Sequence, residues 1–526
     1  MAMIVMELRE SELRLQVTHR RSVWLILVAM VALVDLTLYR SRGFGGPAIF
    51  FPVALTLLLL GRNRIEKNAA WIIVTTLLIL LSASMVWAGG FGQIVAAVWL
   101  LIAANLAAQS VMPYVLESII APAAAVPGGY EFFHGIQLNW RRVVLDTVDH
   151  GRPSRVMNYL LPIISVIVFG TVFILANPDV IKELSTMLSG IYEQIHAWVS
   201  RFSASEIIVW CVTIWLTGGL LCPAIRKTIA SEGGGVDEAA PDYDHPMYGP
   251  FRNTLATLIS LFVVYLIFEF RTLWFRSFPE GFHYSGYAHE GAAWLTVALA
   301  LATLTLSLIF RGSMMNDARV ALLKKLAWVW SALNFLLAAS VYNRLLIYVD
   351  FNGMTRMRAI GFLGISAVVG GFILVLFKIA HRQKFIWLIR RQLWVLAFAI
   401  YLYLVIPVDM LVHCYNVQRI LAGSPAPCVQ ISEHPMTDDA LPQLLPLLES
   451  DNQTIREGIR AKLRNRLILL KSGVDPHLQH WTAAQFGREH ALQKLQTAES
   501  LLQQIGTDDN ASSALQSFHD YAMQWW

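Results

Sequence analysis

Nine ionisable or hydroxyl side chains stand at the ends of long apolar runs, where charged groups are unexpected. They come from the stretches "NRLLIYVDFNGMTRMR", "YAHEG" and "VDMLVH", and they are Arg344, Tyr348, Thr355, Arg356, Arg358, His289, Glu290, Asp409 and His413. The arginine guanidinium presents a rigid fork of donors that matches phosphate and carboxylate groups. These residues therefore either clamp an anionic lipid or lipid-linked ligand, or lock neighbouring helices by pairing with one another.

The backbone between the arginines is predicted to turn. "DFNG" holds Asn352, which tolerates the left-handed conformation, and Gly353, which adopts it freely. Thr355 is placed to cap a following helix through its hydroxyl. Arg344 and Arg358 then bracket the turn from two adjacent helices. The acidic partners expected for a lock are Asp350, Glu290 or Asp409.

Catalytic and metal chemistry have weaker signals. Asp35 lies at the outer end of the first predicted span, a place where multi-pass glycosyltransferases carry an acidic residue, so it is a weak catalytic candidate. Asp409 and His413 are four residues apart, but this spacing is no zinc signature. The outer C-terminal segment contains no Gly-rich phosphate loop and no nucleophile elbow. We expect no metal, no cofactor and no nucleic-acid partner.

Composition indicates a membrane protein. The chain has 526 residues, of which 56% are hydrophobic and only 15% are charged, and the apolar residues come in blocks. The predicted fold is an all-α polytopic transmembrane bundle of about eleven spans with a small C-terminal soluble helical module. The spans are residues 22–39, 47–61, 69–88, 91–112, 158–176, 206–225, 253–270, 291–310, 326–346, 359–380 and 392–412. The surrounding bilayer makes membrane lipids expected partners.

The distribution of cations predicts the orientation. Alternate connecting segments, beginning with residues 1–21, hold many more Lys and Arg residues than the segments between them. Because Lys and Arg in short loops resist translocation, the richer side is cytoplasmic. We therefore expect a bacterial inner-membrane protein with a cytoplasmic N-terminus and a periplasmic C-terminus.

The chain divides into three predicted regions. Residues 1–21 form a cytoplasmic N-terminal segment, residues 22–412 the transmembrane bundle, and residues 413–526 an outer helical module. Within the bundle, residues 178–203 carry one apolar stripe, which is typical of an amphipathic helix at the outer face. Residues 226–251 are acidic and rich in Gly and Pro, which indicates a flexible cytoplasmic loop. In the module, helices are predicted after Thr437 and over 453–472, 480–505 and 511–525.

Two cysteines lie on the predicted outer side. Cys414 and Cys428 flank the segment "YNVQRILAGSPAP", and an oxidising compartment would permit a disulfide that closes this loop. The alternative is a pair of unrelated thiols.

Several segments together resemble a known family. They are "LVDLTLYRSRGFGGPAIFF", "ANPDVIKEL", "YAHEGAAWLTVALAL", "YNRLLIYVDFNGMTRMRAIGFLGI" and "HWTAAQFGREHALQKL". They resemble bacterial multi-pass membrane proteins grouped as a domain of unknown function numbered four-one-seven-three, with a four-one-five-three relative. The matching residues are Tyr287, Gly291, Arg344, Tyr348, Gly353, Thr355 and Arg358. The resemblance implies a polytopic inner-membrane protein and brings no catalytic residues. Where this family often has Tyr, the chain has Asn352, which a turn tolerates.

Three functions are open to such a chain. The first is a non-enzymatic envelope scaffold or sensor that engages a protein partner through its outer helical module. The second is a membrane enzyme that acts on a lipid-linked substrate at the outer face, and the third is a transporter. The first two differ in whether Asp35, Arg344 and Arg358 pair within a closed bundle or converge on an open cavity.

Overall fold

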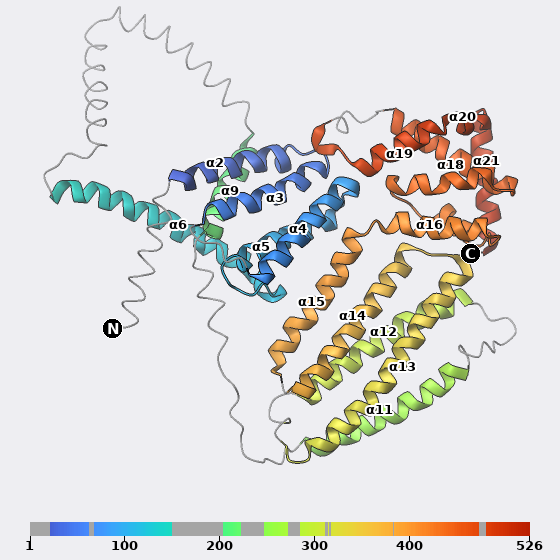
Figure 1. Cartoon of the computed structure of the whole chain (residues 1–526), viewed down its shortest axis with the longest axis horizontal. Helices are drawn as coiled ribbons and strands as arrows, with labels where there is room; N and C mark the ends of the chain where they lie inside the picture. The colour runs from blue at the N-terminus through green and yellow to red at the C-terminus, as the bar shows by residue number, and fades with distance from the viewer. Residues whose placement is uncertain are drawn as a thin grey trace, which may run out of the picture.

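The computed structural model describes residues 21–62, 68–149, 203–221, 247–271, 284–310, 314, 317–381, 383–472 and 480–525, with backbone alone over 135–149 and 284–294. Every regular element in these ranges is a helix (Figure 1). The predicted all-α class is confirmed. The arrangement has two groups of long helices and a third group of shorter ones near the C-terminus.

The first group surrounds one hydrophobic core. It comprises α2 (Arg21–Val34) with the π-helix η1 (Asp35–Tyr39), α3 (Gly45–Leu60), α4 (Ala69–Ala88), α5 (Phe91–Ala107), α6 (Val115–Asp149) and α9 (Ala204–Leu221). Leu78, Leu81 and Met85 of α4 are fully buried in this core. Asn68 starts α4 as an N-cap, because its side chain accepts a hydrogen bond from the Trp71 backbone N–H at 2.7 Å.

The second group has its own cores. It comprises α11 (Tyr248–Glu269), α12 (Tyr284–Ile309), α13 (Val320–Asn352), α14 (Arg356–His381) and α15 (Phe385–Val405). Leu306, Trp330 and Val375, from α12, α13 and α14, meet in one hydrophobic cluster. Short connections at alternating ends join α13 to α14 and α14 to α15, so these three helices run up and down side by side (Figure 1).

The C-terminal helices form a smaller unit with a separate core. They are α16 (Val408–Leu421), α17 (Cys428–Glu433), the 3-10 helix η4 (Asp438–Glu449), α18 (Gln453–Lys471), η6 (Trp481–Ala483), α19 (Phe486–Thr497), α20 (Glu499–Leu502), η7 (Gln503–Ile505), α21 (Asp508–Ala522) and η8 (Met523–Trp525). Leu444, Ile459, Leu495 and Phe518 meet in its core. The predicted helices are present, although the third is divided into shorter pieces.

The module contacts the first group of long helices. Asp439 accepts a hydrogen bond from Trp87 Nε1 of α4 at 3.2 Å, and the Thr482 hydroxyl accepts one from the Arg42 backbone N–H at 3.0 Å. A Cβ on Gly43 would lie 2.8 Å from the Ala483 Cα, so the two backbones are in close contact. The module therefore covers one end of the molecule.

Among the described residues, five helices are long and apolar enough to cross a membrane. They are α4, α11, α13, α14 and α15, and between 11% and 33% of each apolar window is buried inside the protein. The shorter apolar helices are Val23–Tyr39, Gly45–Leu60, Phe91–Ala107, Ser205–Leu221 and Leu295–Ile309. These elements overlap ten of the predicted spans, and span 158–176 lies outside the described residues. The protein is a membrane protein, and the count of about eleven crossings stays a prediction.

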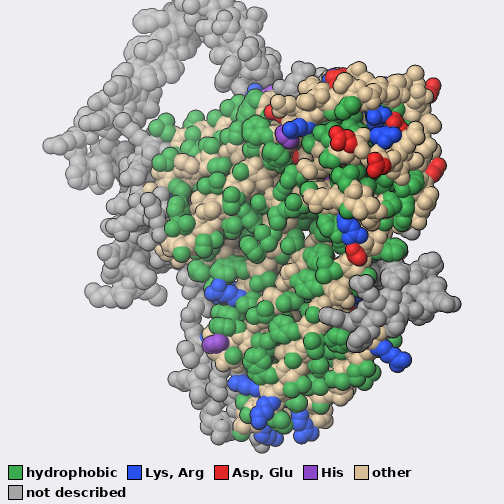
Figure 2. Space-filling model, turned by 45° about the vertical axis from the view of Figure 1, so that its right-hand side comes forward, with side chains coloured by type: hydrophobic (Ala, Val, Ile, Leu, Met, Phe, Trp, Pro, Cys, Tyr) green, Lys and Arg blue, Asp and Glu red, His purple; other side chains and the backbone are tan. Residues whose placement is uncertain are grey.

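The surface has an apolar middle and two polar ends. Figure 2 shows hydrophobic side chains over the long helices, Lys and Arg at the end away from the module, and charges of both signs on the module. Lys325 near the start of α13, His381 at the end of α14 and Lys384 before α15 are exposed at that far end. A wide apolar band between polar ends is the pattern that a bilayer requires.

Some local predictions differ from the structure. Pro407 divides the predicted span 392–412, because proline lacks a backbone donor and disfavours a helical residue before it. Asp409, which falls within this predicted span, and His413, which directly follows it, therefore belong to the separate helix α16. Tyr248 already begins α11, so that helix includes the last residues of the predicted loop 226–251. Residues 222–246 and the amphipathic segment 178–203, apart from its last residue, lie outside the described residues.

Candidate functional site: the turn between α13 and α14

The turn itself follows from its sequence. Asn352 ends α13, and Gly353 has φ of +94°, a conformation that side chains rarely adopt. The Thr355 hydroxyl accepts a hydrogen bond from the Arg358 backbone N–H at 3.2 Å, so the predicted cap of α14 is confirmed. The left-handed residue is the glycine, and the preceding asparagine stays helical.

The module holds this turn by its backbone. The Asn416 side chain of α16 accepts a hydrogen bond from Met354 N–H at 2.7 Å and donates one to the Met354 carbonyl at 2.9 Å. Gln430 of α17 donates to the Asn352 carbonyl at 2.9 Å. Asn416 is fully buried and Gln430 nearly so. These contacts satisfy turn groups that no helix could satisfy, which joins the module to the bundle. We call Asn352–Arg358 with Asn416 and Gln430 the latch.

One residue of the latch, Arg356, forms a charged pair. Arg356 of α14 donates to both carboxylate oxygens of Asp409 through Nε and Nη2. Asp409 also accepts from the Thr437 backbone N–H at 2.8 Å and from the Thr437 hydroxyl at 2.9 Å. Burial alone would raise the pKa of Asp409, but the hydrogen bonds from Arg356 and Thr437 outweigh it and lower that pKa. Asp409 is therefore an ionised structural group that links bundle and module.

Arg358 faces into the turn. It is only 5% exposed, its Nη2 donates to Asn352 Oδ1 at 2.5 Å, and its Nη1 donates to the Gly353 carbonyl. Its guanidinium lies 3.7 Å from the centre of the Tyr348 ring, a cation–π contact. The arginine therefore stabilises the backbone on which it stands.

Arg344, which precedes the turn on α13, forms an ion pair that is almost completely buried. It is 2% exposed and Glu269 of α11 is fully buried. Arg344 Nε lies 2.6 Å from Glu269 Oε1, and Nη2 lies 2.5 Å from Oε2. Ser340 and Tyr265 donate to the same carboxylate at 2.7 and 3.0 Å. This is a bidentate lock between α11 and α13 with both carboxylate oxygens satisfied.

The expected acidic partners are only partly those found. Asp409 pairs with Arg356, as the lock hypothesis allowed. Asp350 pairs with Arg419 of α16 at 2.6 Å, a residue that the sequence did not single out. Glu290 and His289 lie in α12, but their side chains are outside the described residues. The candidate side chains thus form separate pairs along α11, α13, α14 and α16.

Asp35 is engaged in structural contacts. Its Oδ2 lies 3.0 Å from Arg40 Nε, and Trp210 Nε1 donates to its Oδ1 at 3.3 Å. Arg40 also pairs with Glu206 of α9 at 2.6 Å. This cluster joins η1 to α9 and does not meet the latch, so the weak catalytic candidate stands apart from the arginines.

His413 is enclosed in α16. It is 3% exposed, and its Nδ1 has no hydrogen-bond partner among the described residues. Burial lowers the pKa of His413 to about 4, and the nearby Asp409 only partly opposes this effect. The imidazole is neutral at ordinary pH. No group of three or more potential metal-ligating side chains lies together in the described part of the chain.

The predicted disulfide is absent. Cys414 and Cys428 are both free thiols in the structure. Cys428 begins α17 and is fully buried in the module core, whereas Cys414 stands half-buried on α16, where Gln418 contacts its sulfur at 3.7 Å. Burial raises the pKa of Cys428 to about 12, so its thiol is unreactive. The alternative of two unrelated thiols describes the structure.

Sequence reasoning missed Asn416 and Gln430, and it placed Glu269 among the charged residues at helix ends without identifying it as the partner of Arg344. Asn416, Gln430 and Glu269 contact partners that are 62, 78 and 75 residues away in the chain, respectively. No local spacing identifies such pairs. The available signal was a polar residue on an apolar helix face, since a buried polar group requires a partner. Thr437 directly precedes the predicted helix η4, and its hydroxyl donates a hydrogen bond to Asp409.

The comparisons with known proteins give a family and nothing further. The model of a family described as Domain of unknown function (DUF4153) matches residues 54–447, which is most of the chain. Of the two families that the sequence segments resemble, this is the one numbered four-one-five-three. The number four-one-seven-three, given there as the main family, was wrong. None of the curated proteins and none of the solved structures matches the chain.

Proposed function

The chain belongs to the DUF4153 family, a family of unknown function, and from that premise we propose that it is a non-enzymatic scaffold or sensor of the bacterial inner membrane. The module, residues 413–526, engages a protein partner on the periplasmic side. The helical bundle anchors that contact and relays it through the latch.

One observation carries this proposal. Arg344 and Arg358, which would line a ligand cavity in an enzyme, make hydrogen bonds within the protein while nearly buried. Arg356 is bound to Asp409, which in turn is bound to the module at Thr437. Polar groups used in this way fix the position of the module relative to α13 and α14, as a scaffold requires.

The proposed orientation rests on the two polar ends. Lys325 and Lys384 are exposed at the end of the bundle opposite the latch. Cationic ends resist translocation, so this end is cytoplasmic and the module is periplasmic. A phosphatase fused after Trp526, which is active only outside the cytoplasm, tests this orientation. We expect this phosphatase fusion to be fully active. An inactive phosphatase fusion, together with an active fusion at the same position to a reporter that works only in the cytosol, would overturn the proposed orientation.

The module offers an apolar contact for a partner. Ile468 and Leu469 near the end of α18 are 48% and 60% exposed, which is unusual for two adjacent large apolar side chains on a polar helix. A protein partner that covers them would remove this apolar area from water.

Photo-cross-linking in native membranes tests the proposed partner. A photoreactive amino acid replaces Leu469 in one variant and Gln516, which is exposed on the polar side of α21, in a matched control. We expect one discrete protein adduct from position 469 and none from position 516. Equal labelling from both positions, or no protein adduct from position 469, would overturn the proposal.

A further inference from the structure

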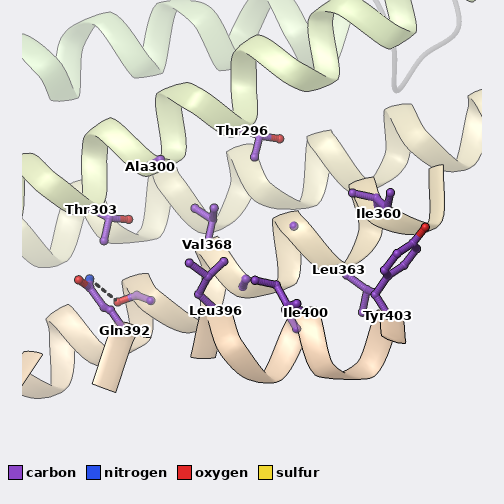
Figure 3. Close-up of a pocket in the computed structure, with 14 residues that line it drawn as sticks. Thr296, Ala300, Thr303, Ile360, Leu363, Val368, Gln392, Leu396, Ile400 and Tyr403 are labelled. Atoms are coloured by element: carbon purple, nitrogen blue, oxygen red, sulfur yellow. Dashed lines mark hydrogen bonds between the residues drawn. The ribbon is translucent and has the colours of Figure 1, made fainter. Parts of the chain in front are cut away.

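A groove lies among three long helices, and one of its ends is near the latch. It has a volume of about 570 Å³ between α12, α14 and α15. Figure 3 shows side chains of the three helices directed at one space. Its wall includes Thr296, Thr303, Ile360, Gly364, Leu396 and Tyr403. This volume is in the range of sites for small molecules.

Small residues create the space. A Cβ added to Gly364 would meet nothing within 4 Å, so the helix surface is hollow at that point. Ala300, Ala367 and Ala399 form further parts of the wall with short side chains. The adjacent Leu396 and Ile400 remain about half exposed although they face the groove. Apolar walls without a protein side chain between them favour an apolar occupant.

The groove matches one leaflet of a bilayer in length and setting. Only 28% of the apolar window of α14 and 11% of that of α15 are buried inside the protein, so these helices face lipid. From Ile360 to Gly371 the helix α14 rises roughly 16 Å. The hydrocarbon core of a bilayer is about 30 Å thick, and half of that is one layer of acyl chains.

The two ends of the groove differ in their polar groups. At the end away from the latch, Gln392 donates to the Gly371 carbonyl at 3.5 Å, a bond drawn in Figure 3, and Thr303 donates to the Leu299 carbonyl at 2.9 Å. At this end of the groove, each of these two side chains already donates a hydrogen bond within the protein.

The end near the latch keeps two donors without partners. Arg356 stands one helical turn before Ile360 on the same face of α14, and its side chain is 39% exposed. Its Nε and Nη2 bind Asp409, whereas its Nη1 and the Tyr403 hydroxyl have no hydrogen-bond partner among the described residues. The Tyr403 side chain lies close enough to interact electrostatically with Arg356. Two donors thus stand where a lipid headgroup begins.

We propose that this groove binds one phospholipid, with an acyl chain along α14 and α15 and the headgroup phosphate accepting hydrogen bonds from Arg356 Nη1 and the Tyr403 hydroxyl. The charge of Arg356 is already balanced by Asp409. The site therefore recognises the phosphate diester by its acceptors and admits lipids of different headgroups. A neutral diacylglycerol lacks the phosphate and binds less well.

Photolabelling of the full chain in lipid nanodiscs tests the chain-binding part. The probe is phosphatidylglycerol with a diazirine in one acyl chain, and mass spectrometry locates the labelled residues. Gly364→Leu fills the groove, and Gly249→Leu is the matched control, because a Cβ there also meets nothing within 4 Å. We expect labelling at residues 396–403 to fall at least about tenfold in Gly364→Leu, the loss expected if two methylenes are displaced, and to persist in the control.

A second arm tests the headgroup part. A diacylglycerol with the same photoreactive chain is compared with the phosphatidylglycerol probe in the native chain and in Tyr403→Phe. We expect the native chain to prefer the phospholipid by at least about fivefold, which is what even one of the two hydrogen bonds gives at about 1 kcal/mol, and Tyr403→Phe to reduce that preference. The proposal is overturned if α11, a helix outside the groove, is labelled as strongly as residues 396–403, or if both probes label equally.

Discussion

Replacing Glu269 tests whether the arginines of this site are structural. In Glu269→Ala, the Arg344 guanidinium would stay buried without its counter-charge, and the Ser340 and Tyr265 hydroxyls would lose their acceptor. Arg344 is 2% exposed and Glu269 fully buried, so water cannot replace the lost contacts. Breaking a buried pair by removing one partner costs about 3–5 kcal/mol. We expect a loss of unfolding free energy of that size.

The assay is unfolding of the purified full chain by SDS in mixed micelles, followed by tryptophan fluorescence. The double variant Glu269→Leu with Arg344→Met removes both charges, and we expect it to recover most of the lost stability, since apolar replacement of a whole buried pair is often neutral. The control is Arg464→Ala, because the Arg464–Asp508 pair has an 86% exposed carboxylate and should contribute less than about 1 kcal/mol. If Glu269→Ala costs no more than this control, the interpretation of Arg344 as a structural lock is wrong.

Three further outcomes follow from the same structure. Gly353→Ala should destabilise the chain by about 1–3 kcal/mol in the same assay, because φ is +94° and the new Cβ would lie 2.6 Å from Asn416 Oδ1. The pKa of His413 is about 4 in the folded chain, whereas the same imidazole in the unfolded chain takes up a proton below about pH 6.5. The free energy of unfolding should therefore fall by about 2 kcal/mol from pH 7 to pH 5. His413→Phe should lose this part of the pH dependence. In maleimide labelling of the native chain at pH 7, Cys414 should react and Cys428 only after denaturation, and equal rates would contradict the burial of Cys428.

The sequence predicts the long helices well because their physical signal is local. Blocks of apolar residues mark α4, α13 and α14, and Gly353 and Thr355 mark the turn, since each acts through its own backbone conformation or through an amide three residues away. Pro407 was an equally local signal, and it explains why the last predicted span ends early.

The pairing of the candidate residues could not be predicted in the same way. Arg344 could have paired with several carboxylates, and only the packing of α11 on α13 selects Glu269. Cys414 and Cys428 flank a short loop, but Cys428 faces the module core, a direction that sequence spacing alone does not reveal. The hydrogen bonds of Asn416 to both backbone groups of Met354 likewise depend on how the module docks.

Hydrogen exchange of the Met354 amide measures the latch most directly. This N–H donates to Asn416 Oδ1 at 2.7 Å in a turn that no helix protects. We predict slow exchange in the full chain and exchange at least about tenfold faster in Asn416→Ala, since the loss of one buried hydrogen bond of about 1.5 kcal/mol has that effect. The control Asn510→Ala, within the module, should leave this amide unchanged. Equally fast exchange in the native chain and in Asn416→Ala would show that the module is not joined to the bundle at this turn.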